Sequence, residues 1–318
     1  MYKDKKILLS KRGYIFWLEH SRVKSENNTL VYLKAENGIF KSFNIPFMNT
    51  SILMLGEGCS ITRDAVSFLS DSGTLLMFVG GGGTPLHASS DLAFNIISPS
   101  SEYRPTQYMQ QWIMIFIDES KRLEASKHFM NLRIQNIVAF YAKLDFIREM
   151  GISISEDSSK ILELKEKIKN STNTNELLLH EAWFTKYLYG LFAKVINLSS
   201  FTREQGKNSN ENDIDIINSY LDHGNYLMYG LASVTLHGLG ISYALPLLHG
   251  KTRRGALVFD VADLVKDALC LPFAFYSGIN GYDAREFRQK LIGLVHKEKV
   301  LDLLFLQVKE TTEKDFDV

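Results

Sequence analysis

Three acids and one histidine in the second half of the chain have the residue types of a metal site. Glu181 interrupts the apolar face of a helical pattern, and His249 precedes a helix that opens with Asp260 and Asp263. Because these aspartates stand three residues apart, they project from neighbouring positions on one helical face. Carboxylates with one imidazole suit a hard divalent cation, Mg²⁺ or Mn²⁺, better than zinc, for which no thiolates are positioned.

Three cations follow the histidine directly. Lys251, Arg253 and Arg254 lie between His249 and the two aspartates, where they would hold phosphates beside a divalent cation. Such a cation stabilises the charge that builds during phosphodiester displacement. A glycosidase could also use two carboxylates, but it needs no flanking cations. The pattern favours phosphodiester chemistry, and the alternatives are a non-catalytic nucleic-acid-binding scaffold and a metal-dependent phosphohydrolase of small molecules.

Each of the four candidate ligands also has a structural interpretation. Glu181 could form an ion pair with Arg or Lys at the rim of the core, since an unpaired carboxylate on a core face is costly. Asp260 could cap the helix, and Asp263 could be an acid of its first turn. His249 could be a hydrogen-bonded structural histidine. The spacing of these residues leaves both kinds of interpretation open.

The elements that must position these residues divide the chain into two parts. Short runs rich in Ile, Val, Tyr and Phe predict strands in the first part, followed by a helix over 63–70 that Thr62 caps and Gly73 ends. Beyond Thr106, apolar residues recur at helical spacing. We expect an α+β multidomain protein, with a small β-rich domain at 1–98, a linker at 99–105 and a larger all-α catalytic domain at 106–318. The expected strands are Lys6–Ser10, Tyr14–Leu18, Thr29–Lys34, Ile39–Phe47, Ser51–Met54 and Thr74–Val79.

Composition excludes several other classes of protein. The 318 residues include 36 Lys+Arg and 36 Asp+Glu, which excludes a uniformly basic nucleic-acid coat but permits a local basic groove. A hydrophobic fraction of 45% is ordinary for globular proteins and excludes wholesale disorder. Cys59 and Cys270 form no CxxC motif, so we expect no disulfide scaffold and a reducing, cytoplasmic location.

One uncharged stretch raises the question of a membrane. Residues His223–Gly250 contain no Asp, Glu, Lys or Arg and are numerous enough to cross a bilayer. His237, Pro246 and several glycines favour a buried helix pair instead. We further expect a polar surface loop at Ser199–Asp213 and a frayed tail at Lys309–Val318.

Several segments together resemble the CRISPR-associated adaptation integrase family, the Cas1 endonucleases, and most closely its subtype I-F branch. The spacing His-x10-Asp-x2-Asp, downstream of a helical glutamate and behind a β-rich domain, is a specific combination. One departure is Ala182, where many members have glycine after the glutamate. The segments that carry the resemblance are Leu55–Ala65, Thr74–Gly83, Leu179–Ala182 with Tyr187, His223–Leu227 and His249–Asp267.

The resemblance implies a metal-dependent DNA endonuclease and integrase of antiviral defence. It would join the 3′-hydroxyl ends of captured DNA fragments to the CRISPR array by transesterification. The family pattern implies that Glu181, His249 and Asp263 bind Mg²⁺ or Mn²⁺ and that Asp260 supports this catalytic site. It also implies a homodimer formed through the β-rich domain and a second Cas protein as partner, which in the I-F branch is fused to the Cas3 helicase-nuclease.

Overall fold

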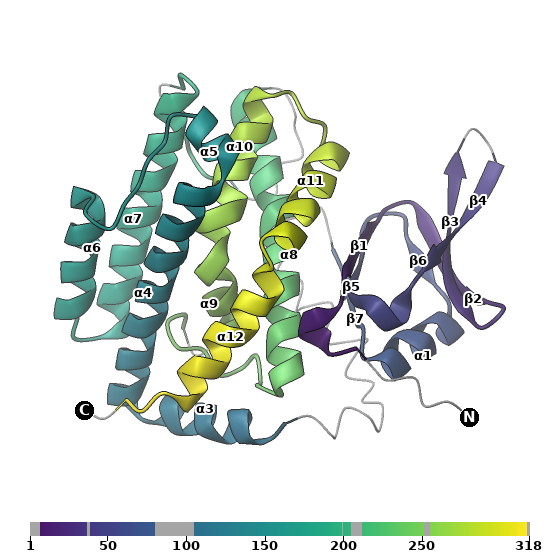
Figure 1. The fold of residues 1–318 in the computed structure, drawn as a ribbon, viewed down its shortest axis with the longest axis horizontal. Helices are drawn as coiled ribbons and strands as arrows, with labels where there is room; N and C mark the ends of the chain where they lie inside the picture. The colour runs from purple at the N-terminus through teal and green to yellow at the C-terminus, as the bar shows by residue number, and fades with distance from the viewer. Residues whose placement is uncertain are drawn as a thin grey trace. The chain divides into compact units, whose positions relative to one another are not determined.

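The computed structural model describes residues 7–36, 39–79, 105–198, 200–204, 212–250 and 255–316. The chain divides into two compact units, Met1–Pro105 and Thr106–Val318 (Figure 1). Of the linker expected at 99–105, only Pro105 belongs to the described residues, and residues 80–83 of the segment Thr74–Gly83 lie outside them. The first unit is rich in strands and the second is helical, so the expected α+β class is confirmed.

Two small sheets and one helix build the first unit. In one sheet β5 lies between β1 and β7, and all three strands are parallel. The other sheet has the order β4-β3-β2-β6, with antiparallel pairing except between β2 and β6. The bounds are β1 Tyr14–Leu18, β2 Ser21–Glu26, β3 Thr29–Glu36, β4 Ile39–Ile45, β5 Thr50–Leu55, β6 Ser60–Ile61, α1 Arg63–Ser72 and β7 Leu75–Phe78.

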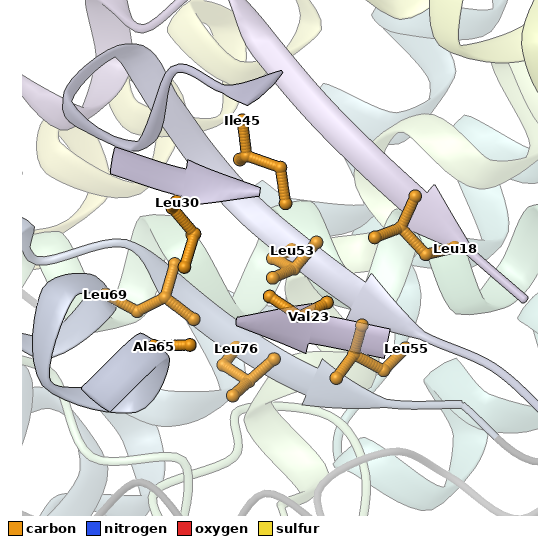
Figure 2. Close-up of a cluster of buried hydrophobic side chains, with 9 residues drawn as sticks. All are labelled: Leu18, Val23, Leu30, Ile45, Leu53, Leu55, Ala65, Leu69 and Leu76. Carbon is orange, nitrogen blue, oxygen red and sulfur yellow. The ribbon is translucent and has the colours of Figure 1, made fainter. Parts of the chain in front are cut away.

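An aliphatic cluster between these elements forms the core of the first unit (Figure 2). The central strand β5 is buried along its whole length, as is typical of a parallel strand covered on both faces. Each fully buried Leu or Ile contributes roughly 1.5 to 3 kcal/mol to stability. The cluster consists of Leu18, Val23, Leu30, Ile45, Leu53, Leu55, Ala65, Leu69 and Leu76.

The ends of α1 agree with the expected signals, whereas one expected strand does not form. The Thr62 hydroxyl accepts the N–H of Ala65, and Gly73 ends the helix with a φ of 70°. The strand expected at Lys6–Ser10 is wrong, because Leu9–Lys11 form a 3₁₀ turn. Strand β2 was not expected, since its sequence is mostly polar and Val23 is its single large aliphatic residue.

The second unit is helical throughout its described part. Helix α9 packs against α4 and α8, and all ten of its residues are buried. A helix that is apolar on nearly every side requires such a central place. The bounds are α3 Gln107–Ile117, α4 Glu119–Lys143, α5 Asp145–Glu149, α6 Ser159–Asn170, α7 Thr174–Val195, α8 Asp213–Leu239, α9 Ala256–Val265, a π-helical turn Lys266–Cys270, α10 Leu271–Ile279, α11 Ala284–Lys297 and α12 Val300–Glu313.

The uncharged stretch His223–Gly250 forms one helix rather than the expected pair. Gly240, with a φ of 71°, ends α8, and the residues that follow up to Gly250 are not helical. Within the described ranges no helix is long and apolar enough to cross a membrane. The tail is also more ordered than expected, because α12 extends to Glu313 and Phe316 is buried. Of the loop expected at Ser199–Asp213, residues 199 and 205–211 lie outside the described residues.

Candidate metal centre

Asp260 binds the segment that carries His249. Its two carboxylate oxygens accept the backbone N–H groups of Leu247 (2.7 Å), Leu248 (3.2 Å) and His249 (3.1 Å). One of them also lies 2.6 Å from Nδ1 of the His249 ring. With the proton on Nδ1, the ring donates a hydrogen bond to the carboxylate of Asp260, and the other ring nitrogen, Nε2, is left to bind a metal. Asp260 thereby fixes both the backbone turn and the orientation of the imidazole.

The structure brings the three expected ligands together from distant parts of the chain. Glu181 lies on α7, His249 follows α8, and Asp263 lies on α9. One ligand atom from each of the three lies within 4.8 Å of the others. Ligand atoms bound at about 2.1 Å to one octahedral Mg²⁺ stand about 3 to 4 Å apart. The spacing of the three ligand atoms is therefore close to the spacing that a single cation requires.

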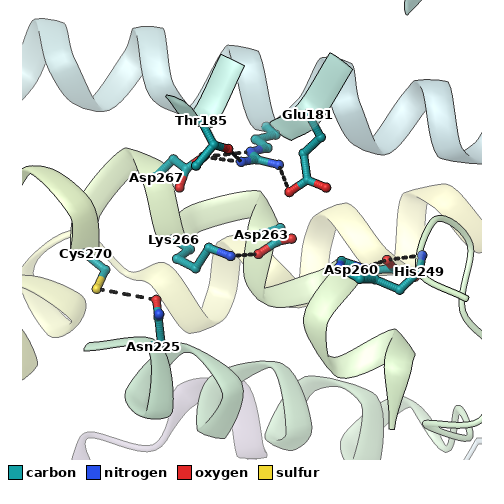
Figure 3. A network of polar contacts seen from close by, with 10 residues as sticks. Glu181, Thr185, Asn225, His249, Asp260, Asp263, Lys266, Asp267 and Cys270 are labelled. Atoms are coloured by element: carbon teal, nitrogen blue, oxygen red, sulfur yellow. Dashed lines mark hydrogen bonds and ion pairs between the residues drawn. The ribbon is translucent and has the colours of Figure 1, made fainter. Parts of the chain in front are cut away.

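Two cations, the buried Arg133 and the half-buried Lys266, lie against the same acids; Figure 3 shows Lys266 beside Asp263. Nη1 of Arg133 donates to Oε1 of Glu181 at 2.7 Å, and the ammonium group of Lys266 binds the carboxylate of Asp263. Arg133 also binds Asp267, whose carboxylate is buried beside it. The ion pair that was the structural alternative for Glu181 thus exists, and Glu181 also belongs to the acid cluster.

These charges set the protonation states around the cluster. Burial favours the neutral form of Asp263, but the charges of Lys266, Arg133 and His249 outweigh it and lower its pKa to about 2. Burial likewise opposes a charge on His249, but the hydrogen bond with Asp260 and the negative charges of Asp260, Asp263 and Glu181 raise its pKa. At neutral pH, Asp263 is an ionised carboxylate and can bind a cation without first losing a proton.

The helix that carries the aspartates begins earlier than expected. Gly255, with a φ of 62°, precedes the first residue of α9, Ala256, so Asp260 and Asp263 lie inside the helix and not at its start. The helix-cap interpretation of Asp260 and the first-turn interpretation of Asp263 are therefore wrong. The apolar residues Ala256–Phe259 form the first turn of the same buried helix, so the helix does not open with Asp260 as expected.

The candidate phosphate-binding cations Lys251, Arg253 and Arg254 lie outside the described residues, so their role stays a prediction. A small pocket, with a volume of about 10 Å³, lies beside the acid cluster, lined by Asp260 and Asp263 and by apolar side chains that include Phe129, Met130 and Leu248.

Three residues of the centre were missed by sequence reasoning. Lys266 and Asp267 follow Asp263 at three and four residues, which places all three on one side of a helix and was a usable signal. Arg133 lies on α4 among buried positions such as Ile134 and Ile137. Arg133 is a charged residue among apolar positions, as Glu181 is, and this was the same kind of signal.

The architecture and this cluster define a class of protein: a β-rich unit joined to a helical unit that carries a candidate site for a divalent cation. The chain belongs to the family of CRISPR associated protein Cas1, whose profile matches residues 14–305. The resemblance noted from the sequence is thereby confirmed.

Two curated relatives are similar over nearly their whole lengths. The CRISPR-associated endonuclease Cas1 of Pectobacterium atrosepticum is 40% identical over 314 residues, covering 98% of this chain and 95% of the relative. The CRISPR-associated endonuclease Cas1 of Pseudomonas aeruginosa is 38% identical over 320 residues, covering 98% and 96%.

Solved structures share the fold at lower identity. A Cas1 protein from Thermotoga maritima has a TM-score of 0.69 at 17% identity, covering 94% of this chain and 96% of that chain. The TtCas1–DNA complex has a TM-score of 0.67 at 20% identity, covering 95% and 92%. A casposase bound to its integration product has a TM-score of 0.69 at 14% identity, covering 95% and 92%.

Proposed function

We propose that this chain is a divalent-metal-dependent DNA endonuclease and integrase of CRISPR adaptation. It would join the 3′-hydroxyl ends of captured DNA fragments to the CRISPR array by transesterification. The observation that carries the proposal is the convergence of Glu181, His249 and Asp263 to within 4.8 Å. Two curated relatives are named endonucleases, and a casposase with this fold was solved with an integration product, which supports the assignment.

The donor set fits Mg²⁺ or Mn²⁺, because it consists of two carboxylates and one imidazole and includes no thiolate. A bound cation would stabilise the negative charge that builds on the phosphate and on the departing oxygen. The chain's own residues hold this donor set in place. Asp260 fixes the His249 ring through Nδ1, while Arg133 and Lys266 reduce the repulsion between the carboxylates of Glu181 and Asp263.

Positioning of DNA would fall to the cations next to the site. Lys251, Arg253 and Arg254 follow His249 in the sequence, and we assign them to the phosphates that flank the reacting one. Exchange of one phosphodiester for another needs little net energy, so alignment of the 3′-hydroxyl and stabilisation of charge would account for the rate.

The proposed partners follow from the family. We propose DNA as substrate, a homodimer formed through the β-rich unit, and a second Cas protein, fused in the I-F branch to the Cas3 helicase-nuclease. Among the solved structures that share the fold are a Cas1–DNA complex and a Cas6-RT-Cas1–Cas2 complex. We also propose that the protein acts in the cytoplasm, where the CRISPR array lies.

The test is cleavage of branched DNA by the purified protein with Mn²⁺, Mg²⁺ or a chelator. We expect metal-dependent cleavage that His249→Ala and Asp263→Ala reduce by at least about 100-fold, since both remove proposed ligands. Asp145→Ala is a matched control, because Asp145 is an exposed acid on α5. Cleavage at the wild-type rate by the two ligand variants would contradict the assignment of the site.

The same samples separate the alternatives. A non-catalytic scaffold would bind DNA with a steep dependence on salt, would keep binding in the chelator, and would cut nothing. A phosphohydrolase of small molecules would bind nucleotides in competition with duplex DNA.

A further inference from the structure

One arginine joins three separate elements at the candidate metal centre. Arg133, on α4, donates through Nη1 to Oε1 of Glu181 and through Nη2 to the hydroxyl of Thr185 at 2.9 Å, both on α7. Its Nε donates at 3.0 Å to Asp267 in the π-helical turn, and its Nη2 binds the same carboxylate oxygen. Only 5% of the Arg133 side chain is exposed, and only 2% of the Asp267 side chain.

We propose that Arg133 is a positioning residue of the metal centre, which holds Glu181 in place as a ligand while Asp267 supplies the charge that balances the guanidinium. The inference rests on the proposed function, since it requires that Glu181 bind a divalent cation. Arg133 itself would not touch the metal or the DNA.

The shape of the guanidinium suits this role. Its N–H groups point in fixed directions in one plane, so contacts with Asp267 and Thr185 determine where Nη1 points. Nη1 then holds one oxygen of Glu181, and the second oxygen stays available to a cation. A lysine ammonium is a point donor on a flexible stem and cannot hold Glu181, Thr185 and Asp267 in a fixed geometry.

The charge balance explains the presence of Asp267. If Glu181 were the only partner of Arg133, the guanidinium would neutralise the negative charge of Glu181 that attracts the metal. Because two N–H groups of Arg133 bind Asp267, these two residues form a neutral buried pair. Glu181 can then keep its charge for the cation while its orientation is still fixed by Nη1. Removing the charge of Asp267 should therefore weaken metal binding, although Asp267 is not one of the three clustered ligands.

The experiment measures binding of Mn²⁺ to the full-length protein by electron paramagnetic resonance of the free ion. The variants are Arg133→Lys, Asp267→Asn and Thr185→Val, and each is first checked for folding by circular dichroism. Arg122→Lys is the matched control, because it makes the same substitution on the same helix away from the acid cluster. Cleavage of branched DNA across a series of Mn²⁺ concentrations gives the KM for metal and the kcat at saturation.

We expect Arg133→Lys and Asp267→Asn to weaken Mn²⁺ binding by about 10- to 100-fold, as loss of the partners that orient metal ligands does elsewhere. Thr185→Val, which removes a single contact of Arg133, should weaken it less, and Arg122→Lys should leave it unchanged. In the cleavage assay the KM for Mn²⁺ should rise more than kcat falls. A purely structural role for Arg133 would lower thermal stability without moving the Mn²⁺ affinity of the folded variants.

Failure of the inference can be told apart from failure of the proposed function. If the wild-type protein binds Mn²⁺ and folded Arg133→Lys binds it within twofold of wild type, Arg133 does not position a ligand. If Arg133→Lys does not fold, the order of affinities among Asp267→Asn, Thr185→Val and wild type decides, and equal affinities overturn the inference. Absence of Mn²⁺ binding by the wild-type protein would contradict the proposed function, and this inference with it.

Discussion

The carboxylate of Asp260 lies 2.6 Å from Nδ1 of His249 and also accepts three backbone N–H groups from the turn that ends at that histidine. A single buried side chain thus fixes both the turn and the ring. Both contacts come from within the protein, so Asp260 sets the orientation of the imidazole.

Replacing Asp260 should therefore affect both stability and metal binding. Asp260→Ala leaves the N–H groups of Leu247 and Leu248 without their acceptor inside the protein. An unsatisfied buried donor costs about 1 to 3 kcal/mol, so we expect a loss of roughly 3 kcal/mol in the free energy of unfolding. Urea denaturation measures this loss. Asp260→Asn keeps one acceptor oxygen and should lose less stability, and equal stability of wild type and Asp260→Ala would contradict the role given to this carboxylate.

The ammonium group of Lys266 and a bound divalent cation would both supply positive charge to the carboxylate of Asp263. Lys266→Met leaves the buried carboxylate of Asp263 without its ammonium partner, and breaking a buried ion pair costs about 3 to 5 kcal/mol. A divalent cation at the proposed site would replace part of that charge. We expect Mn²⁺ to raise the Tm of Lys266→Met by more than it raises the Tm of the wild-type protein. A smaller rise in the variant would indicate that Asp263 does not bind the ion.

The end of the chain should make stability depend on pH through His128. Nζ of Lys314 lies 3.2 Å from Nδ1 of His128, and Phe316 packs against the same ring. Burial and, after it, the charge of Lys314 lower the pKa of His128 to about 4. The unfolded chain therefore binds a proton here below the ordinary histidine pKa of 6.5, while the folded chain does not until about pH 4. The resulting stability is present above pH 6.5 and is lost as the pH falls toward 4.

Thermal unfolding at pH 7.5 and pH 5 measures this contribution. The loss of Tm between the two values should be smaller for His128→Gln than for the wild-type protein. Lys314→Gln should reduce it as well, because that variant removes the repulsion that a protonated His128 would meet. An equal loss of Tm in wild type and His128→Gln would show that this ring is not kept neutral by folding.

Helix α8 and the π-helical turn approach each other closely at Gly224 and Cys270. A smaller side chain at one position should therefore compensate for a larger one at the other. A Cβ added at Gly224 would overlap Sγ of Cys270, the buried last residue of the turn that also carries Lys266 and Asp267. Overpacking of this kind costs about 1 to 3 kcal/mol, so Gly224→Ala should be destabilising.

The double variant Gly224→Ala with Cys270→Ala should lose less free energy of unfolding than the two single variants lose together, because the overlapping sulfur is removed. Chemical denaturation of the four proteins in this cycle measures the coupling. Additive losses in the free energy of unfolding would mean that the added Cβ and the Cys270 sulfur do not overlap.

The division into a strand-rich and a helical part could be predicted because it rests on local patterns. Runs rich in Ile, Val, Tyr and Phe identified strands such as Tyr14–Leu18, and the cap signals identified the helix that begins after Thr62. The polar strand Ser21–Glu26 lacks such a run and is held by pairing with its neighbours.

The candidate site could be predicted only in part, because some of its residues stand out locally while others meet only through the packing of helices. Glu181 was noticeable as a carboxylate among apolar positions, and His249 and Asp263 by their residue types and spacing; the family pattern then assigned all three as metal ligands. Arg133 stands 48 residues from Glu181 and 134 from Asp267 in sequence, and their contact arises only when α4 packs against α7 and the π-helical turn. Local spacing reveals a pair such as Lys266 and Asp263 on one helix, but it does not show that Arg133 would meet Glu181 and Asp267.

The central claim is that Glu181, His249 and Asp263 together bind the divalent cation of a DNA integrase. Its most direct test is the joining of a labelled DNA fragment with free 3′-hydroxyl ends to a supercoiled plasmid that carries a CRISPR array, in the presence of Mn²⁺. Wild-type protein, with its partner Cas protein added, should join the fragment, and His249→Ala should reduce the rate by at least about 100-fold. Joining by a folded His249→Ala protein at the wild-type rate would contradict the account.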